Sequence, residues 1–277
     1  MTDHHVVMFS SGAGSAVAAK RVAETHGTER LTLLFADVNM EHPDNYRFLR
    51  EAHEWVGGEL VILDNDGLTI WDVFRDRRFL GNTRVDLCSR VLKREPMRKW
   101  LEANRDPATT VVHLGFDISE EHRIHRAAPH WVPWHVEAPL CWEPVIWKDQ
   151  AINTLKAAGI EAPWLTRQGF PHANCGGGCV KAGVGQFRRL LADQPGTYAS
   201  WEREEELMRD HLGKDVAILR DRRGGTTKPL TLAALRERTE AEDAATLAAL
   251  MEVDEGDACN CMGDYSTEVP VTLGGGA

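Results

Sequence analysis

The sequence has no apolar run long enough to cross a membrane, so we expect no membrane partner. Its first residues, 1–5, have neither the basic flank nor the apolar core of a signal peptide, which favours a cytoplasmic protein. No segment recurs at a fixed period, which argues against a solenoid or a propeller. With 43% hydrophobic and 27% charged residues, the 277-residue chain has the composition of one large globular domain with a subdomain, or of two modest domains.

Positive charge is in short supply, because 32 Lys and Arg residues face 42 Asp and Glu residues and the net charge is −10. A field of that sign repels polyanions, so a nucleic-acid partner would have to be met by a local basic patch. Arginine-rich stretches are the candidates, although charge runs are more often solvated faces. They are residues 75–78, 123–126 and 220–223.

The first informative stretch, residues 6–20, lacks the lysine of a Walker A motif and the spacing of a G-x-G-x-x-G loop. A short apolar run precedes a loop of glycine, alanine and serine, which predicts a buried strand, a tight turn and a helix. Such a turn presents free N–H groups and a helix dipole to an anion, and Ser10, Ser11 and Ser15 add hydroxyl donors. Small residues also serve close packing alone, and the pattern does not separate the two explanations.

Apolar runs of strand length alternate with helical patterns through the first half of the chain. We predict strands over residues 31–36, 60–63 and 109–115, and helices over residues 16–26, 43–56 and 90–103. This alternation is typical of an α/β fold with a doubly wound, mostly parallel sheet, which binds ligands at the carboxyl ends of its strands. The segments expected at those ends are residues 10–15, 37–41 and 115–117.

The second half of the chain differs from the first in composition. Residues 127–171 are rich in Trp and Pro and predict a lid over the site, a surface that stacks nucleobases, or a satellite core. Later expectations are helices over residues 148–158, 183–191 and 198–212, a hairpin around residues 217–225, and a helix or a pair of helices over residues 230–250. The expected division is a nucleotide-binding core (1–126), a lid with a Cys-rich segment (127–190) and a mainly helical, Cys-containing extension (191–277).

Six cysteines in a chain without a secretion signal indicate metal binding, catalysis or simple burial rather than disulfides. Cys175 and Cys179 are separated by three glycines, which let two thiols wrap a metal without interference from side chains. Cys259 and Cys261 form a second short-spaced pair, while Cys88 stands alone. Four thiolates suit a zinc ion, and three or four suit an iron–sulfur cluster. The remaining thiol, at position 141, is expected to be a buried small hydrophobe.

Together these segments resemble the ATP pyrophosphatase and phosphoadenosine-phosphosulfate (PAPS) reductase superfamily, and especially its phage and bacterial PAPS-reductase-like subgroup. The motifs are residues 10–15 for the pyrophosphate loop (PP-loop), residues 35–37 with Glu41, Cys88-Ser89-Arg90-x-x-Lys93-x-x-Pro96, residues 115–117 with Glu120, Glu121 and Arg123, and residues 175–181. Three positions differ: Ser11 and Gly14 stand where ATP-using members have Gly and Asp, and Ser89 where cluster-containing reductases have a second Cys. The resemblance implies an adenine nucleotide alpha hydrolase-like fold.

The resemblance also implies which residues form the sites. Nucleotide-binding roles fall on Ser10, Ser11, Gly12, Ala13, Gly14, Ser15, Asp37, Glu41, Gly115 and Arg126. Catalytic roles fall on Cys88, Cys259, Cys261, Lys93 and Arg123. Metal ligands are drawn from Cys88, Cys175, Cys179, Cys259 and Cys261. In one assignment the first three of these hold a [4Fe-4S] cluster and one of the last two is a fourth ligand or sulfur carrier. In the other, the last four bind the metal.

Two reactions are consistent with the resemblance. One is sulfur transfer, in which ATP activates a nucleotide or nucleic acid for thiolation beside the cluster. The other is reduction of an adenylyl sulfonucleotide (PAPS or its unphosphorylated form, APS) by thiol attack, with release of sulfite. The implied partners are an adenine nucleotide, a sulfur donor or thiol-reductant protein, a nucleic-acid substrate and further copies of the chain. A third hypothesis is a non-catalytic nucleotide- or nucleic-acid-binding protein with a structural zinc site.

Overall fold

The structure is a computed structural model that describes residues 3–82, 87–171 and 173–256. The chain divides into two compact units, residues 1–235 and 236–277. The division at residues 126 and 190 stays a prediction. None of the helices in the described ranges combines the length and apolar character that a membrane span requires. Cys259 and Cys261 lie outside the described residues.

Five parallel strands form the central sheet of the first unit. They are β1 (His4–Met8), β2 (Leu31–Ala36), β3 (Glu59–Leu63), β4 (Thr110–Leu114) and β5 (His135–Glu137), in the order β3-β2-β1-β4-β5. The predicted α/β fold with a parallel sheet is therefore confirmed. The strand order reverses at β1, so the loops after β1 and β4 diverge and leave a crevice between them.

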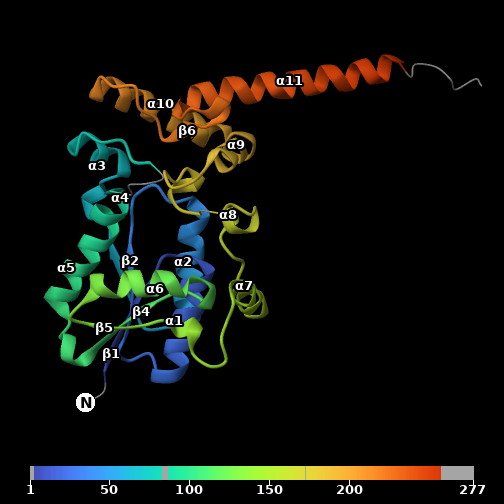
Figure 1. Cartoon of the computed structure of the whole chain (residues 1–277). Helices are drawn as coiled ribbons and strands as arrows, with labels where there is room; N and C mark the ends of the chain where they lie inside the picture. The colour runs from blue at the N-terminus through green and yellow to red at the C-terminus, as the bar shows by residue number, and fades with distance from the viewer. Residues whose placement is uncertain (1–2, 83–86, 172, 257–277) are drawn as a thin grey trace, which may run out of the picture. The chain divides into compact units, whose positions relative to one another are not determined.

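Alternate residues of the buried strands face two separate cores. Val7, Phe9 and Leu33 pack with α1 (Ala13–His26), α2 (Pro43–Val56) and α7 (Lys148–Ala157). Their neighbours Val6, Met8 and Leu34 pack on the opposite face with α5 (Glu95–Asn104), Trp131 and Trp134. The sheet is thus covered on both faces, as the near-continuous apolar runs predict (Figure 1). The two tryptophans come from the Trp- and Pro-rich segment and belong to this core of the central sheet, not to a separate satellite core.

A third core lies in the same unit and involves little of the sheet. It is built from α3 (Ile70–Asp76), α4 (Leu87–Ser89), α9 (Val184–Asp193), α10 (Pro195–Leu212) and the antiparallel hairpin of β6 (Leu219–Asp221) and β7 (Lys228–Leu230). Val38, just after β2, joins this core and connects it to the carboxyl edge of the sheet. Cys88 and Cys175 are buried in it, and Cys179 packs against it.

The remaining helical segments are short, apart from α11 (Leu232–Gly256). They are α6 (Glu121–Ala127), α8 (Trp164–Arg167), the π turn η2 (Arg90–Arg94) and the 3-10 turns η1 (Asn65–Gly67), η3 (Pro107–Thr109), η4 (Ile118–Glu120), η5 (Ala128–Trp131), η6 (Pro139–Cys141), η7 (Cys175–Gly177) and η8 (Arg223–Gly225). The helix predicted over residues 90–103 is therefore continuous with α4 but contains a π turn, which a hydrophobic period does not reveal.

Candidate functional site

A cavity of about 390 Å³ lies where the loop after β1 meets the loop after β4. Of the residues predicted to bind or act on a nucleotide, seven line it: Ser10, Gly12, Ala13, Gly14, Ser15, Gly115 and Arg123. The first amides of α1 have no partner within the helix, and the positive end of the helix dipole is there as well. The cavity therefore combines small residues, free amides and positive charge, which is the chemistry of an anion site.

Two glycines allow these loops to approach each other closely. A Cβ atom on Gly14 would lie 3.0 Å from the carbonyl oxygen of Gly115, and a Cβ on Gly115 would lie 2.8 Å from Cα of Ser15. Larger side chains would push the two loops apart, so the glycines set the width of the cavity. This packing gives a structural reason for Gly14, at the position where ATP-using members of the superfamily that the sequence resembles carry Asp.

The serine hydroxyls in the loop have internal roles. Ser15 Oγ accepts from the Gly12 amide at 3.2 Å and donates to the Gly12 carbonyl at 2.9 Å. Ser11 is buried, has a positive φ of 55°, and donates its hydroxyl to the carbonyl of Asn45 at 2.9 Å. Ser15 thus fixes the shape of the turn, and Ser11 ties the turn to α2.

Two cations, Arg123 and Lys148, and two carboxylates, Asp117 and Glu120, line the loop cavity. Arg123 forms an ion pair with Glu120 and lies over the Phe116 ring, 4.4 Å from its centroid. Lys148 was not predicted from the sequence, because it begins α7, far from every motif in the chain. Within the described residues no ion pair of Lys148 is found, which leaves its ammonium available for an anion.

Other predicted nucleotide-binding residues lie outside this cavity. Arg126 is exposed and does not line it. Asp37 is buried and accepts hydrogen bonds from the amide of Asn39 at 2.8 Å and the hydroxyl of Tyr46 at 2.9 Å. Asp37 therefore shapes the loop after β2. Asp117, which lines the cavity and accepts from the Ser119 amide at 2.9 Å, has the corresponding role after β4.

The third core brings together the predicted thiol ligands that fall in the described ranges. Cys88 comes from α4, and Cys175 and Cys179 come from the glycine-rich loop. The charge states of these thiols are coupled, because Cys175 interacts electrostatically with both of the others. The fourth described cysteine, Cys141, lies apart, with its Sγ 3.7 Å from the carbonyl oxygen of Phe116.

The three glycines of this loop have distinct structural roles. Gly176 and Gly177 have positive φ angles of 62° and 93°, a conformation that favours glycine. Gly178 packs on α10, where a Cβ atom would come within 2.2 Å of Trp201 Cε2. The loop between the thiols is therefore wrapped against α10, and its glycines are needed for the wrapping itself.

Glu41 and Lys93 form a pair beside Cys175. Lys93 Nζ lies 3.3 Å from Glu41 Oε1 and donates to Asn174 Oδ1 at 3.4 Å. The other oxygen of Glu41 accepts from the amide of Cys175 at 3.0 Å. The Glu41 side chain is 2% exposed and that of Lys93 is 24% exposed. Glu41 was predicted to bind nucleotide, but the structure places its carboxylate against the cysteine loop.

Burial dominates the titration of this group. It raises the pKa of Cys175 well above its ordinary value, and the Glu41 carboxylate adds to that rise while Lys93 opposes it. Burial also raises the pKa of Cys179. For Lys93, burial works against the charged form, yet Glu41 and the neighbouring thiols raise its pKa overall. Burial therefore favours the protonated form of the Cys175 and Cys179 thiols, and Lys93 keeps its charge within its pair with Glu41.

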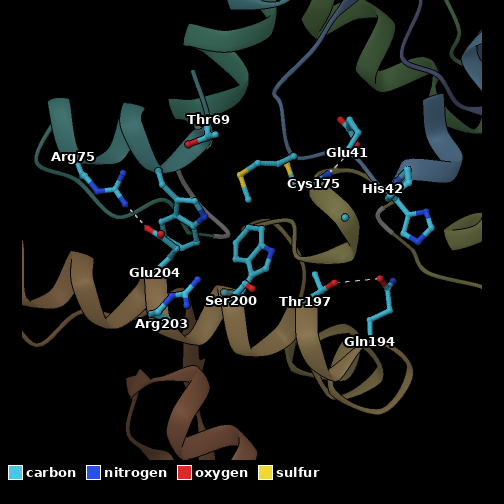
Figure 2. Close-up of a pocket in the computed structure, with 15 residues that line it drawn as sticks. Glu41, His42, Thr69, Arg75, Cys175, Gln194, Thr197, Ser200, Arg203 and Glu204 are labelled. Atoms are coloured by element: carbon cyan, nitrogen blue, oxygen red, sulfur yellow. Dashed lines mark hydrogen bonds and ion pairs between the residues drawn. The ribbon is translucent and has the colours of Figure 1, made fainter. Parts of the chain in front are cut away.

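A second cavity, also of about 390 Å³, opens onto Cys175. Figure 2 shows it between the glycine-rich loop, the loop with Glu41 and His42, α3 and α10. Arg75 bridges α3 to α10 through an ion pair with Glu204. Trp71 and Trp201 supply apolar lining and meet edge to face, with ring centroids 5.1 Å apart. The cavity therefore reaches Cys175, one of the three residues of the thiol core.

The loop after β1 and the glycine-rich loop of the thiol core are joined by a chain of hydrogen bonds. Ser11 donates to the carbonyl of Asn45, and the side-chain amide of Asn45 donates to Glu41 Oε2 at 3.3 Å. That same oxygen accepts from the Cys175 amide. Both ends, Ser11 and Cys175, have positive φ values of 55° and 53°, which are uncommon for residues other than glycine. The carboxylate of Glu41 thus connects two turns, each of which contains a residue with positive φ.

Metal binding can be tested against the geometry of the described residues. Within them, no three side chains of His, Cys, Asp or Glu are grouped so that they could hold a single metal ion. A single zinc requires its thiolates to converge on one point, whereas each iron of a cluster takes its own thiolate. Cys88, Cys175 and Cys179 share one core, and whether they hold a cluster stays a prediction.

No protein-family model and no curated protein matches this chain. Among solved structures, the chain is similar to the NH3-dependent NAD synthetase from Campylobacter jejuni subsp. jejuni NCTC 11168, in complex with the nitrate ion. The two are 13% identical, with a TM-score of 0.41, over 78% of this chain and 86% of that chain. A likeness of this degree carries no argument about activity, so the function has to be argued from the geometry of the two cavities and the thiols.

Proposed function

We propose that the protein is a PP-loop enzyme that binds an adenine nucleotide in the loop cavity and transfers sulfur to a nucleotide or nucleic acid beside an iron–sulfur cluster. The observation that carries this proposal is the hydrogen-bonded chain from Ser11 through Asn45 and Glu41 to Cys175. It supports the proposal because it connects the turn proposed to bind an anion to the loop that carries two of the proposed cluster ligands.

The nucleotide part of the proposal rests on the loop cavity. The amides at the start of α1 bind phosphate oxygens, and Arg123 and Lys148 neutralise the charge that builds up as a phosphoryl bond breaks. The cavity volume of about 390 Å³ lies in the range of small-molecule sites. Its place at the reversal of strand order is where ligands of this fold class bind.

The sulfur part rests on Cys88, Cys175 and Cys179. These three thiolates would hold a [4Fe-4S] cluster, which would supply an iron without a protein ligand for a sulfur species. Lys93 holds positive charge beside the thiols, and the cavity lined by Trp71 and Trp201 leads to Cys175. The lysine charge would attract an anionic sulfur species, and the tryptophan-lined cavity would shield it from water.

The proposed reaction has two balanced steps. An oxygen of the acceptor attacks the α-phosphorus of ATP, so that an O–P bond forms and pyrophosphate leaves. Hydrosulfide, supplied by a sulfur donor, then attacks the carbon or phosphorus that carries the activated oxygen; a bond to sulfur forms and AMP leaves with that oxygen. No net oxidation or reduction occurs, and the proton of hydrosulfide passes to the surrounding base.

The proposal is tested with anaerobically reconstituted protein. Incubation with ATP, sulfide and short oligonucleotides should yield pyrophosphate, AMP and a thiolated product, as measured by chromatography and mass spectrometry. The preparation should be brown, with absorbance near about 400 nm. A colourless protein that holds one zinc per chain would overturn the cluster and favour the non-catalytic hypothesis.

Reduction of a sulfonucleotide is the second candidate, favoured by the packing of Gly14 against Gly115. That packing leaves little room for the aspartate that ATP-using relatives carry. In this reaction a cysteine thiolate attacks the sulfur of the adenylyl sulfate, the S–O bond to the nucleotide breaks, and a second thiol then displaces sulfite as a disulfide forms. Sulfite release from PAPS or APS without ATP turnover would establish this reaction in place of sulfur transfer.

A further inference from the structure

The π turn η2 carries basic side chains on two different sides. Lys93 contacts Glu41 and Asn174 in the thiol core, and Leu92 is buried. Arg90 and Arg94 instead line another cavity, of about 360 Å³, with Arg98 from α5. Its other lining residues are Glu95, Pro129, His130 and Trp131. None of the residues that line this cavity belongs to the arginine-rich stretches identified in the sequence.

Arg98 has the structural role among these three arginines. It donates to the carbonyl of His130 at 2.8 Å and to that of Val132 at 3.0 Å. It also pairs with Glu102 at 2.9 Å. Arg98 thereby holds the segment after α6 against α5 and forms one wall of the cavity.

Arg90 and Arg94 are less well neutralised. Arg90 Nε lies 3.4 Å from Glu95 Oε1, and both side chains are about half exposed, which makes the ion pair weak. No ion pair of Arg94 is found within the described residues, and its buried Nε has no hydrogen-bond partner there. A buried donor without a partner is costly unless a ligand satisfies it. The cavity therefore has a net positive lining in a chain whose net charge is −10.

We infer that this cavity binds the phosphate group of a polynucleotide. Arginine presents several N–H donors in a planar fork that matches phosphate oxygens. Arg90, Arg94 and Arg98 follow one another at intervals of four residues along one continuous helical segment, which suits a strand of phosphates better than one isolated anion. Trp131 is buried, so recognition at this cavity is through the backbone and not through stacking of bases.

The position of this cavity gives it a role in the reaction. Arg94 is adjacent in sequence to Lys93, and Arg90 follows Cys88 by two residues on the same helical segment. A strand held by Arg90 and Arg94 is thus anchored on the helix that carries part of the thiol core. This inference rests on the proposed function, since it names a nucleic acid as the acceptor that is brought to the sulfur.

The test compares the double variant Arg90→Gln/Arg94→Gln with the control Lys156→Gln/Lys214→Gln, which removes the same charge from two exposed lysines outside the described cavities and outside the arginine-rich stretches. Binding of a labelled single-stranded oligonucleotide of about 20 nucleotides is measured by fluorescence anisotropy at 50 and 200 mM salt. We expect the first variant to weaken binding about tenfold and to reduce the salt slope by about one to two. The control should bind within about twofold of the wild type.

Inorganic phosphate and AMP serve as competitors to identify the source of the phosphate. If either displaces the oligonucleotide at micromolar concentration from the wild type but not from the Arg90/Arg94 variant, the cavity binds a free phosphate compound and the inference is overturned. Equal binding by the two double variants would also overturn it. Pyrophosphate release from ATP is measured in parallel, so loss of the proposed catalysis and loss of this binding site are distinguished.

Discussion

At the scale of single residues, Glu41 is the side chain on which the proposed site depends most. Its two oxygens accept from Lys93, Asn45 and the amide of Cys175. The carboxylate is almost fully buried, so removing its charge leaves a lysine ammonium without its partner. A buried pair broken on one side is much more costly than an exposed pair.

We therefore predict that Glu41→Gln lowers the free energy of unfolding by about 1 to 3 kcal/mol, because its amide can satisfy only part of this set of donors. Urea unfolding followed by circular dichroism measures the change. Glu51→Gln is the matched control, since Glu51 forms a partly exposed pair with Arg47 at 2.6 Å. The control should change stability by less than about 1 kcal/mol. Equal effects of the two substitutions would contradict the central role of Glu41.

A second buried carboxylate, Glu205, makes stability depend on pH. Its oxygens accept from the amides of Ile218 at 2.9 Å and Leu232 at 2.6 Å, and burial raises its pKa to about 7 despite these bonds. The folded state retains the proton up to about pH 7, whereas the unfolded chain loses it near 4.5. The stabilisation linked to this proton is complete below pH 4.5 and is lost as the pH rises to about 7.

The variant Glu205→Gln cannot lose that proton. Between pH 5 and pH 7.5, we expect the wild type to lose about 2.4 kcal/mol of unfolding free energy relative to this variant. Urea titrations of both proteins at four pH values measure the difference, in which the other titrating groups cancel. If the two curves of stability against pH stay parallel, the raised pKa of Glu205 is wrong.

At the scale of structural elements, the glycine-rich loop between Cys175 and Cys179 needs glycine for two different physical reasons. Gly178 has a φ of −94°, which suits any residue, but its Cα faces Trp201 of α10. Its absent side chain is therefore demanded by packing and not by the backbone conformation. Gly176 differs, because its positive φ is a backbone conformation that itself favours glycine.

We predict that Gly178→Ala destabilises the protein by about 1 to 3 kcal/mol, because the added methyl group overlaps the Trp201 ring. Its iron content after reconstitution should fall as well, since the loop carries Cys175 and Cys179. Gly185→Ala in α9 is the control and should stabilise by about 0.5 to 1 kcal/mol, because nothing lies within 4 Å of its added Cβ. A stable Gly178→Ala protein with normal iron content would contradict this account of the loop.

Elements of the fold are predictable from sequence where the signal is local. The strand over residues 31–36 and the helix over residues 43–56 are confirmed at the same bounds, because apolar runs, a proline at the start of the helix and a glycine after it mark them. The site was only partly predictable. Lys148 reaches the loop cavity from α7, and Glu41 faces Cys175 across 134 positions of sequence, and neither contact has a local signature.

At the scale of the whole molecule, the chain has two units, and the described thiols of the third core all belong to the first. The two candidate ligand sets differ in what they require of the second unit. Three thiols within residues 1–235 satisfy one set, and the other set needs Cys259 and Cys261 as well.

We predict that a chain ending at residue 240 folds and holds a cluster. Leu232 and Leu235 are fully buried and remain in this chain, so the third core is complete. Its midpoint of urea unfolding should match that of the full chain, and its iron content should exceed half of the full-length value. Cys88→Ser in the full chain should lose most of its iron. If truncation abolishes the cluster while Cys88→Ser retains it, the set with the two C-terminal cysteines is the right one.

The π turn at Arg90–Arg94 has a consequence for how this chain tolerates changes in length. A π turn is equivalent to one extra residue in a helix, and deletion of one residue would rotate the segment before it by about 100° relative to α5. Cys88 and Lys93 could not both keep their places while Arg94 and Arg98 kept theirs. The spacing between Cys88 and α5 is therefore constrained both by the thiol core and by the cavity of Arg94 and Arg98. We expect a single-residue deletion there to disable the proposed sulfur chemistry or the proposed strand binding, even where the helix itself survives.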